Sequence, residues 1–177
     1  MSGMLFRIGV LFFGSLGLAA ICAAIFSFRR RGSAALRAVP GSRIALRISG
    51  RFGLSDRFSG FVDEASAASI MVMDLPQPAF DQLQDLSYLG KMLSEQGVHR
   101  AKRRRLRGRR GEYIYFRGEQ ETALVDYVKY ILFFRGAGAA GMVTANIPRA
   151  ALLSGLVTEG EVESILGSAA MLVEAAG

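Results

Sequence analysis

The residues that could do chemistry are concentrated in one basic segment near the middle of the chain. Eight of the eleven positions from 100 to 110 are basic and none is acidic: Arg100, Lys102, Arg103, Arg104, Arg105, Arg107, Arg109 and Arg110. The chain has 22 lysines and arginines against 15 acidic residues, so without these eight the balance is 14 to 15. The excess positive charge is therefore local, and it predicts contact with phosphates or with an acidic surface.

Two phosphate-bearing partners fit such a segment, namely anionic lipid headgroups and nucleic acid. Nucleic acid is the less favoured because no helix-turn-helix, zinc-finger or aromatic RNA-binding signature surrounds the arginines. A structural interpretation carries about as much weight as binding. In that case the arginines belong to a solvated strand and hairpin turn, where charge deters edge-to-edge pairing.

The carboxylates and lysines offer little catalytic chemistry. Asp63 and Glu64 are adjacent and would point to opposite faces of a strand, which is poor geometry for paired acid and base catalysis. Lys129 lies among apolar residues, and a desolvated lysine can act as a nucleophile. More often such a lysine extends along the sheet and places its ammonium at the rim, here near Asp126 or Glu112. We therefore predict that the protein is not an enzyme, and we keep catalysis by Lys129 or Asp63 as the alternative.

A glycine-rich stretch matches the G-x-G-x-x-G spacing of dinucleotide sites through Gly136, Gly138 and Gly141. In such a site the third glycine opens a long helix whose N-terminus holds the pyrophosphate. Here the residues from Met142 to Ile147 are typical of a strand, which Pro148 ends. The stretch therefore predicts a tight hairpin and no cofactor.

Metal and disulfide chemistry are excluded by residue counts. The chain has one cysteine, Cys22, and one histidine, His99, so it cannot form an internal disulfide or a Cys/His metal cluster. We expect no metal site. A binding groove is a further candidate, lined by aromatic residues and one lysine of the predicted sheet, although aromatics at this period usually form a core: Tyr113, Tyr115, Tyr127 and Lys129.

The N-terminal segment, residues 1–28, contains an uncharged apolar run at residues 8–28. A helix of this length spans roughly 30 Å, the thickness of a hydrocarbon core. We predict an uncleaved single-pass membrane helix, with a removed signal peptide as the alternative. Three arginines, Arg29 to Arg31, follow the run, and the positive-inside rule would place the remaining chain on the cytoplasmic side.

The rest of the chain divides into a linker and one domain. Residues 29–42 are basic and then carry Pro40 and Gly41, which is typical of a juxtamembrane linker, and residues 43–177 would form the domain. Within it, hydrophobic patterns predict strands at 43–48, 58–63, 69–74, 98–107, 112–117, 123–135 and 142–147, a helix from 80 to a glycine at 97, and a C-terminal helix through Val173, capped by Thr158 and Glu161.

This order of elements favours an α+β fold, an antiparallel sheet with helices packed on both faces. The strand at 123–135 is apolar on both faces and should lie in the middle of the sheet, between layers. The arginine-rich strand at 98–107 is the exception to the apolar pattern. These elements would place the basic segment on a strand and the hairpin turn that follows it.

Several stretches resemble the PsbP-like αβα-sandwich superfamily: FSGFVDEASAASIMVMDLP (58–76), Gly97-Val98, RRGEYIYFRG (109–118), YVKYILFF (127–134) and TANIP (144–148). The resemblance covers nearly all of residues 43–177. It implies a non-enzymatic binding scaffold, because this superfamily includes photosystem extrinsic subunits, a nuclear-transport GTPase-binding protein and bacterial chaperones that shelter hydrophobic helices of secreted effectors. It supplies no shared catalytic set. The apolar N-terminal run and the arginine-dense fourth strand depart from the superfamily's pattern.

Together these observations predict a membrane-anchored, non-enzymatic binding domain whose partner is a protein. The basic segment and the open face of the sheet are the expected contact surfaces. The alternative is an electrostatic adaptor that binds anionic lipid headgroups or nucleic acid through residues 100–110.

Overall fold

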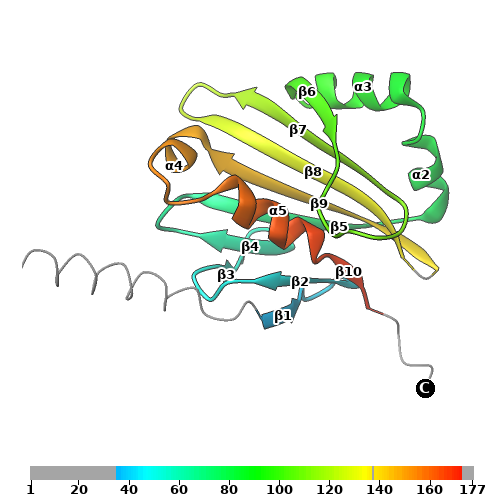
Figure 1. Cartoon of the computed structure of the whole chain (residues 1–177), viewed down its shortest axis with the longest axis horizontal. Coiled ribbons are helices and arrows are strands. Elements are labelled where there is room, and N and C mark those ends of the chain that lie inside the picture. The colour runs from blue at the N-terminus through cyan, green and yellow to red at the C-terminus, as the bar shows by residue number, and fades with distance from the viewer. Residues whose placement is uncertain (1–34, 137, 173–177) are drawn as a thin grey trace, which may run out of the picture. The chain divides into compact units, whose positions relative to one another are not determined.

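The computed structural model describes residues 35–136 and 138–172. This part of the chain is mostly β-structure and forms two antiparallel sheets (Figure 1). The larger sheet has seven strands in the order β3 (Gly53–Leu54), β4 (Gly60–Asp63), β5 (Ala68–Leu75), β9 (Ala139–Pro148), β8 (Asp126–Gly136), β7 (Tyr113–Glu121) and β6 (His99–Arg104).

The smaller sheet has three strands in the order β1 (Ala35–Ala38), β2 (Ile44–Ile48) and β10 (Ala170–Met171). Strand β1 lies inside the predicted linker 29–42, so the sheet structure includes residues before residue 43. The turn from β1 to β2 is closed by a hydrogen bond from the Val39 amide to the Ile44 carbonyl, and Gly41 in this turn has a φ of 74°. Glycine suits that left-handed conformation because it has no Cβ.

Four short helices complete the described structure: α2 (Gln77–Gln82), α3 (Leu86–Glu95), α4 (Arg149–Leu153) and α5 (Glu159–Gly167). Asp85 caps α3 by accepting hydrogen bonds from the amides of Ser87 and Tyr88. Thr158 caps α5 by accepting from the amide of Glu161, as the sequence predicted. The side chains of these caps satisfy backbone amides that have no partner within the helix.

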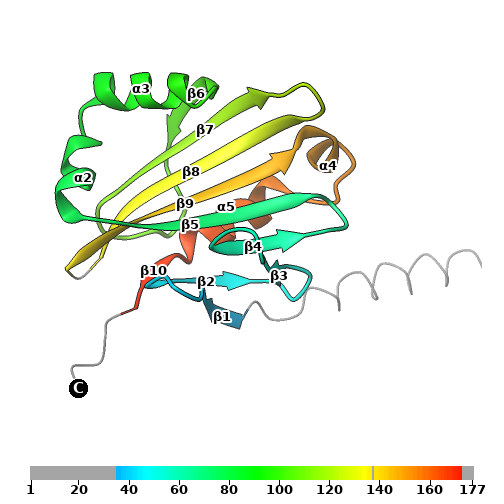
Figure 2. The ribbon, with the colours of Figure 1, turned by 180° about the vertical axis from the view of Figure 1, so that it is seen from behind.

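The two faces of the larger sheet bury different clusters. One face packs against the smaller sheet and α5, with Tyr130 and Leu132 of β8 meeting Ile44, Leu46 and Leu166 in one core. The other face packs against α2 and α3, where Ile131 and Phe133 join Phe80 and Leu89. Figure 2 shows this second face, with α2 and α3 along one end and β5 and β9 in front of α5. The alternating apolar residues of β8 thus serve both cores, and β8 lies inside the sheet as predicted.

The predicted fold class, an α+β domain with one sheet between helices, is wrong. The strand at 43–48 does not join the large sheet but pairs with β1 and β10 in a second sheet. The predicted C-terminal helix stops at Gly167, and the chain then enters β10, which lowers the helical content further. Apolar periodicity indicates that a segment is a strand but not which strand it pairs with, and a strand of two residues has no period to detect.

The predicted membrane span at 8–28 lies outside the described residues. Within residues 35–172, Ala137 aside, no helix is both long and apolar enough to cross a membrane. The longest of these helices, α3, has ten residues. The prediction of a single-pass membrane protein with its domain on the cytoplasmic side depended on that span, and the described residues do not support it.

Candidate functional site: a basic sheet edge

Strand β6 forms one edge of the larger sheet and positions the first half of the basic segment (Figure 1). Helix α3 ends before Gly97, whose φ of 70° lets the chain turn back, and Val98 is buried against the second core. The pairing of β6 with β7 shifts register between His99 and Lys102, where Arg100 has a φ of 51°. From Lys102 onwards the pairing is regular, so this part of the edge is a straight strand.

Two of the eight basic residues interact with groups inside the domain. Arg100 forms ion pairs with Glu119 at 2.9 Å and with Glu121 at 3.7 Å. Arg109 points inward, where its Nη1 donates hydrogen bonds to the carbonyls of Ala169 at 2.8 Å and Gly167 at 3.1 Å, beyond the end of α5. Its guanidinium lies 4.6 Å from the centre of the Phe134 ring. Burial lowers the pKa of the Arg109 guanidinium, which nevertheless stays charged at neutral pH.

The other six basic residues have no such partners. Each is exposed and forms neither an ion pair nor a side-chain hydrogen bond with the residues that the structure describes: Lys102, Arg103, Arg104, Arg105, Arg107 and Arg110. We call these six residues the basic edge. Six neighbouring cations that form no ion pairs with the described residues repel one another, which favours the binding of an anion.

The register of β6 distributes the basic edge over both faces of the sheet. Lys102 is opposite Arg117 and belongs to the face that carries α5, whereas Arg103 is opposite Phe116 and belongs to the other face. Beside the strand is a hollow of about 520 Å³ lined by Arg103, Arg104, Arg105 and Tyr113. Arginines that line a hollow can bind carboxylates or phosphates through paired N–H donors.

The structure does not bring the predicted groove residues together. Tyr113 and Tyr115 belong to the face that packs on α5, and the hydroxyl of Tyr115 donates to Glu163 at 3.2 Å. Burial, together with Glu163, raises the pKa of Tyr115. Tyr127 and Lys129 lie two residues apart on β8 and belong to the opposite face, because they alternate with the buried Val128. Tyr113 instead positions the basic segment by accepting a hydrogen bond from the Leu106 amide at 3.2 Å.

Lys129 lies half-buried on the part of the second face that α2 and α3 leave uncovered. It forms no ion pair with the described residues, and burial lowers the pKa of its ammonium. Its predicted neighbour Glu112 pairs instead with Arg135 at 2.9 Å. On the same face Met71 and Met73 are 40% and 52% exposed. Lys129 is therefore a half-buried cation without an acidic partner on an open sheet surface, directly opposite Asn146 of β9.

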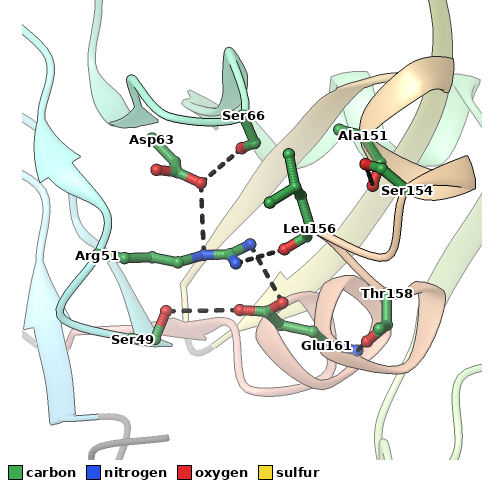
Figure 3. A network of polar contacts seen from close by, with 9 residues as sticks. All are labelled: Ser49, Arg51, Asp63, Ser66, Ala151, Ser154, Leu156, Thr158 and Glu161. Atoms are coloured by element: carbon green, nitrogen blue, oxygen red, sulfur yellow. Dashed lines mark hydrogen bonds and ion pairs between the residues drawn. The ribbon is translucent and has the colours of Figure 1, made fainter. Parts of the chain in front are cut away.

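A partly buried ionic network was not predicted from the sequence (Figure 3). Arg51 contacts two carboxylates, Asp63 at 3.5 Å and Glu161 at 3.2 Å, and donates to the Leu156 carbonyl at 2.6 Å. Asp63 is only 4% exposed and also accepts from Ser66 at 2.5 Å. The network joins β4 to α5, so the polar groups of Asp63 are engaged in structural contacts. Residues 110 positions apart supply it, and no local pattern could have revealed it.

The glycine-rich stretch forms the predicted tight hairpin. Gly136 pairs with Ala139 across the β8–β9 turn, and Phe134 pairs with Gly141. A Cβ at Gly141 would lie 2.9 Å from the Phe134 ring and 2.8 Å from Ile44, so this glycine is needed for close packing. The last glycine, Gly141, lies within β9, so the chain continues from it as a strand rather than as a helix, as expected.

Comparison with known proteins adds little to this description. No protein-family model and no curated protein matches the sequence. Among solved structures, a crystal structure from Bacteroides thetaiotaomicron is similar with a TM-score of 0.49 and 11% sequence identity. The similarity covers 81% of this chain and 50% of that one, so the chain spans about half the length of that protein. The resemblance to the PsbP-like superfamily stays a prediction.

Proposed function

We propose that the described domain is a non-enzymatic binding domain whose basic edge contacts an acidic surface of a protein partner. One observation supports this proposal: six exposed cations on β6 and the following loop form no ion pair with the described residues. Every other described arginine from β7 onwards has an acidic partner, as Arg117 does in Glu159 at 2.7 Å and Arg149 in Glu119 at 2.9 Å. A complementary acidic surface would supply the missing charges and accelerate association.

Two further features support binding rather than catalysis. Asp63, a candidate for catalysis, is paired with Arg51, and Glu112, the expected neighbour of Lys129, is paired with Arg135. The resemblance to the PsbP-like superfamily also implies a binding scaffold. Both features are indirect, so the proposal depends mainly on the basic edge.

A second candidate is an electrostatic adaptor for phosphates, on nucleic acid or on anionic lipid headgroups. The hollow lined by Arg103, Arg104 and Arg105 favours it, because guanidinium groups bind phosphate oxygens in the same paired geometry as carboxylates. The two candidates differ in salt dependence. Each phosphate contact on a nucleic acid releases condensed counterions, so affinity for a polynucleotide falls steeply with salt concentration.

The test compares three probes on the full chain: a glutamate-rich peptide, a single-stranded oligonucleotide and vesicles that contain anionic lipid, each at two salt concentrations. The informative variant is R103E/R104E/R105E. The matched control, R47E/R57E/K91E, makes the same change in net charge at three exposed residues elsewhere. We expect peptide binding to fall at least tenfold in the first variant and less than twofold in the control.

The outcomes separate the candidates. Equal losses in the two variants would show that net charge alone attracts the peptide, and would overturn the proposal. Tight binding of the oligonucleotide or vesicles, with a steep salt dependence and no measurable affinity for the peptide, would establish the adaptor instead.

A further inference from the structure

We infer that the acidic partner binds as an extended strand added to the free edge of β6. This inference rests on the proposed function and specifies the shape of the partner. Strand β6 is the last strand of the larger sheet and pairs only with β7. In a paired strand the backbone groups alternate between the two sides, so those of β6 that face away from β7 have no strand partner.

The backbone of β6 shows no alternative hydrogen bonding on its outer side. Among the described residues, no turn, loop or cap hydrogen bond of the backbone involves residues 99–104. The nearest such contact is the bond from the Val98 amide to the Leu93 carbonyl, which ends the turn after α3. The outer edge between Lys102 and Arg104 is therefore regular in register and available for another strand.

The other sheet edges are poorer templates. At the opposite end of the larger sheet, β3 has only two residues, Gly53 and Leu54. Strand β1, at the edge of the smaller sheet, carries one charged residue, Arg37, whose Nη1 donates to the Phe52 carbonyl. Short strands are a common protection against unwanted pairing. Among the edge strands of the described residues, which include the uncharged two-residue β10, only β6 carries charge on both faces.

The positive charge of β6 determines that the side chains of the added strand should be acidic. Charged edges deter pairing between identical strands, because a second β6 would bring arginine against arginine. The same charges attract an acidic strand. Lys102 and Arg104 lie on one face of the sheet and Arg103 on the other, so an added strand meets cations on both of its faces. The partner segment should therefore carry acidic side chains at consecutive positions rather than at every second one.

The experiment separates backbone pairing from charge attraction. Binding of three acidic octapeptides to the full chain is measured: unmodified, N-methylated at every second residue, and N-methylated at every residue. In an added strand only alternate amides of the peptide face β6. The second peptide therefore keeps all the N–H donors that can face β6, whereas the third has lost every N–H donor. We expect the first two peptides to bind with similar affinity. The affinity of the third should be lower by a factor of roughly ten or more.

Hydrogen exchange provides a second measurement that does not depend on peptide conformation. The outward-facing amides within residues 102–105 should exchange more slowly when the unmodified peptide is bound, whereas exposed amides elsewhere, such as that of Arg57, should not change. Equal binding of all three peptides without this protection would overturn strand addition and leave the proposed function intact. No binding of the unmodified peptide at all would overturn both.

Discussion

The arginine network of Figure 3 and the basic edge use the same side chain in opposite ways. Arg51 has two carboxylates and a carbonyl within 3.5 Å, and it joins segments that are far apart in the chain. The arginines of β6 and the following loop share one segment, and six cations there form no ion pair with the described residues. The comparison teaches that the surroundings of a guanidinium, rather than its presence, indicate whether it stabilises the domain or is available to a partner.

The largest expected effect on stability is at Arg51. Arg51→Met leaves the buried Asp63 without its cation and should lower the free energy of unfolding by about 2–3 kcal/mol, since a buried carboxylate loses its ion-pair partner. Urea unfolding followed by circular dichroism measures this loss. The control, Arg57→Met, removes a fully solvated arginine and should cost less than about 0.5 kcal/mol. Similar losses in both variants would contradict a structural role for the network.

A smaller loss is expected at Arg109, which belongs to the basic segment by sequence but to the interior by contact. Arg109→Met removes hydrogen bonds to the carbonyls of Gly167 and Ala169 and should cost about 1–2 kcal/mol in urea unfolding. Arg110→Met, next to it in the chain and exposed, should leave stability unchanged. If both substitutions proved neutral, the division of the segment into structural and available residues would fail.

A still smaller, pH-dependent effect is expected at Glu159. Burial acts to raise the pKa of this carboxyl, but hydrogen bonds from Arg117 and Tyr130 outweigh it, so the pKa lies below its usual value. A group with a lowered folded-state pKa stabilises the fold above its unfolded pKa, and this contribution disappears as the pH falls through the folded value. When the pH is lowered from 7 to below about 4.5, the free energy of unfolding in urea should therefore fall less in Glu159→Gln than in the unmodified protein. Glu64→Gln, an exposed control, should follow the unmodified protein.

The smallest expected effect on stability is at the basic edge itself. R103Q/R104Q/R105Q should change the free energy of unfolding by less than about 0.5 kcal/mol, since these side chains form no ion pairs with the described residues. Urea unfolding and peptide binding, measured on the same protein, provide the comparison. A large loss of stability would show that these arginines hold the fold together, and the contrast with Arg51 would disappear.

Sequence patterns predicted the features that depend on neighbouring residues. The apolar alternation of β8, the Thr158 cap and the hairpin at Gly136 are local, and all three are found in the structure. The basic segment was also visible, because eight cations in eleven positions are unmistakable. The sequence did not show which of these cations contact the interior of the domain. The inward orientation of Arg109, for example, depends on a carbonyl of α5 almost 60 residues further on.

The smaller sheet and the Arg51 network escaped prediction for the same physical reason. Strand β10 has two residues, too few to show a period, and its partner β2 lies near the other end of the domain. The network depends on Glu161, which comes next to Arg51 only after α5 has packed. Contacts between segments far apart in the chain cannot be predicted from the local sequence of either segment.

The pairing of Ala45 with Ala170 also has a consequence for synthesis on the ribosome. Ala45 leaves the ribosome long before Ala170, so β2 cannot complete its sheet until almost the entire domain has been translated. Contacts so far apart along the chain close late and slow folding. A nascent chain stopped short of residue 170 would keep one side of β2 open, and would be the form most exposed to proteases and to aggregation.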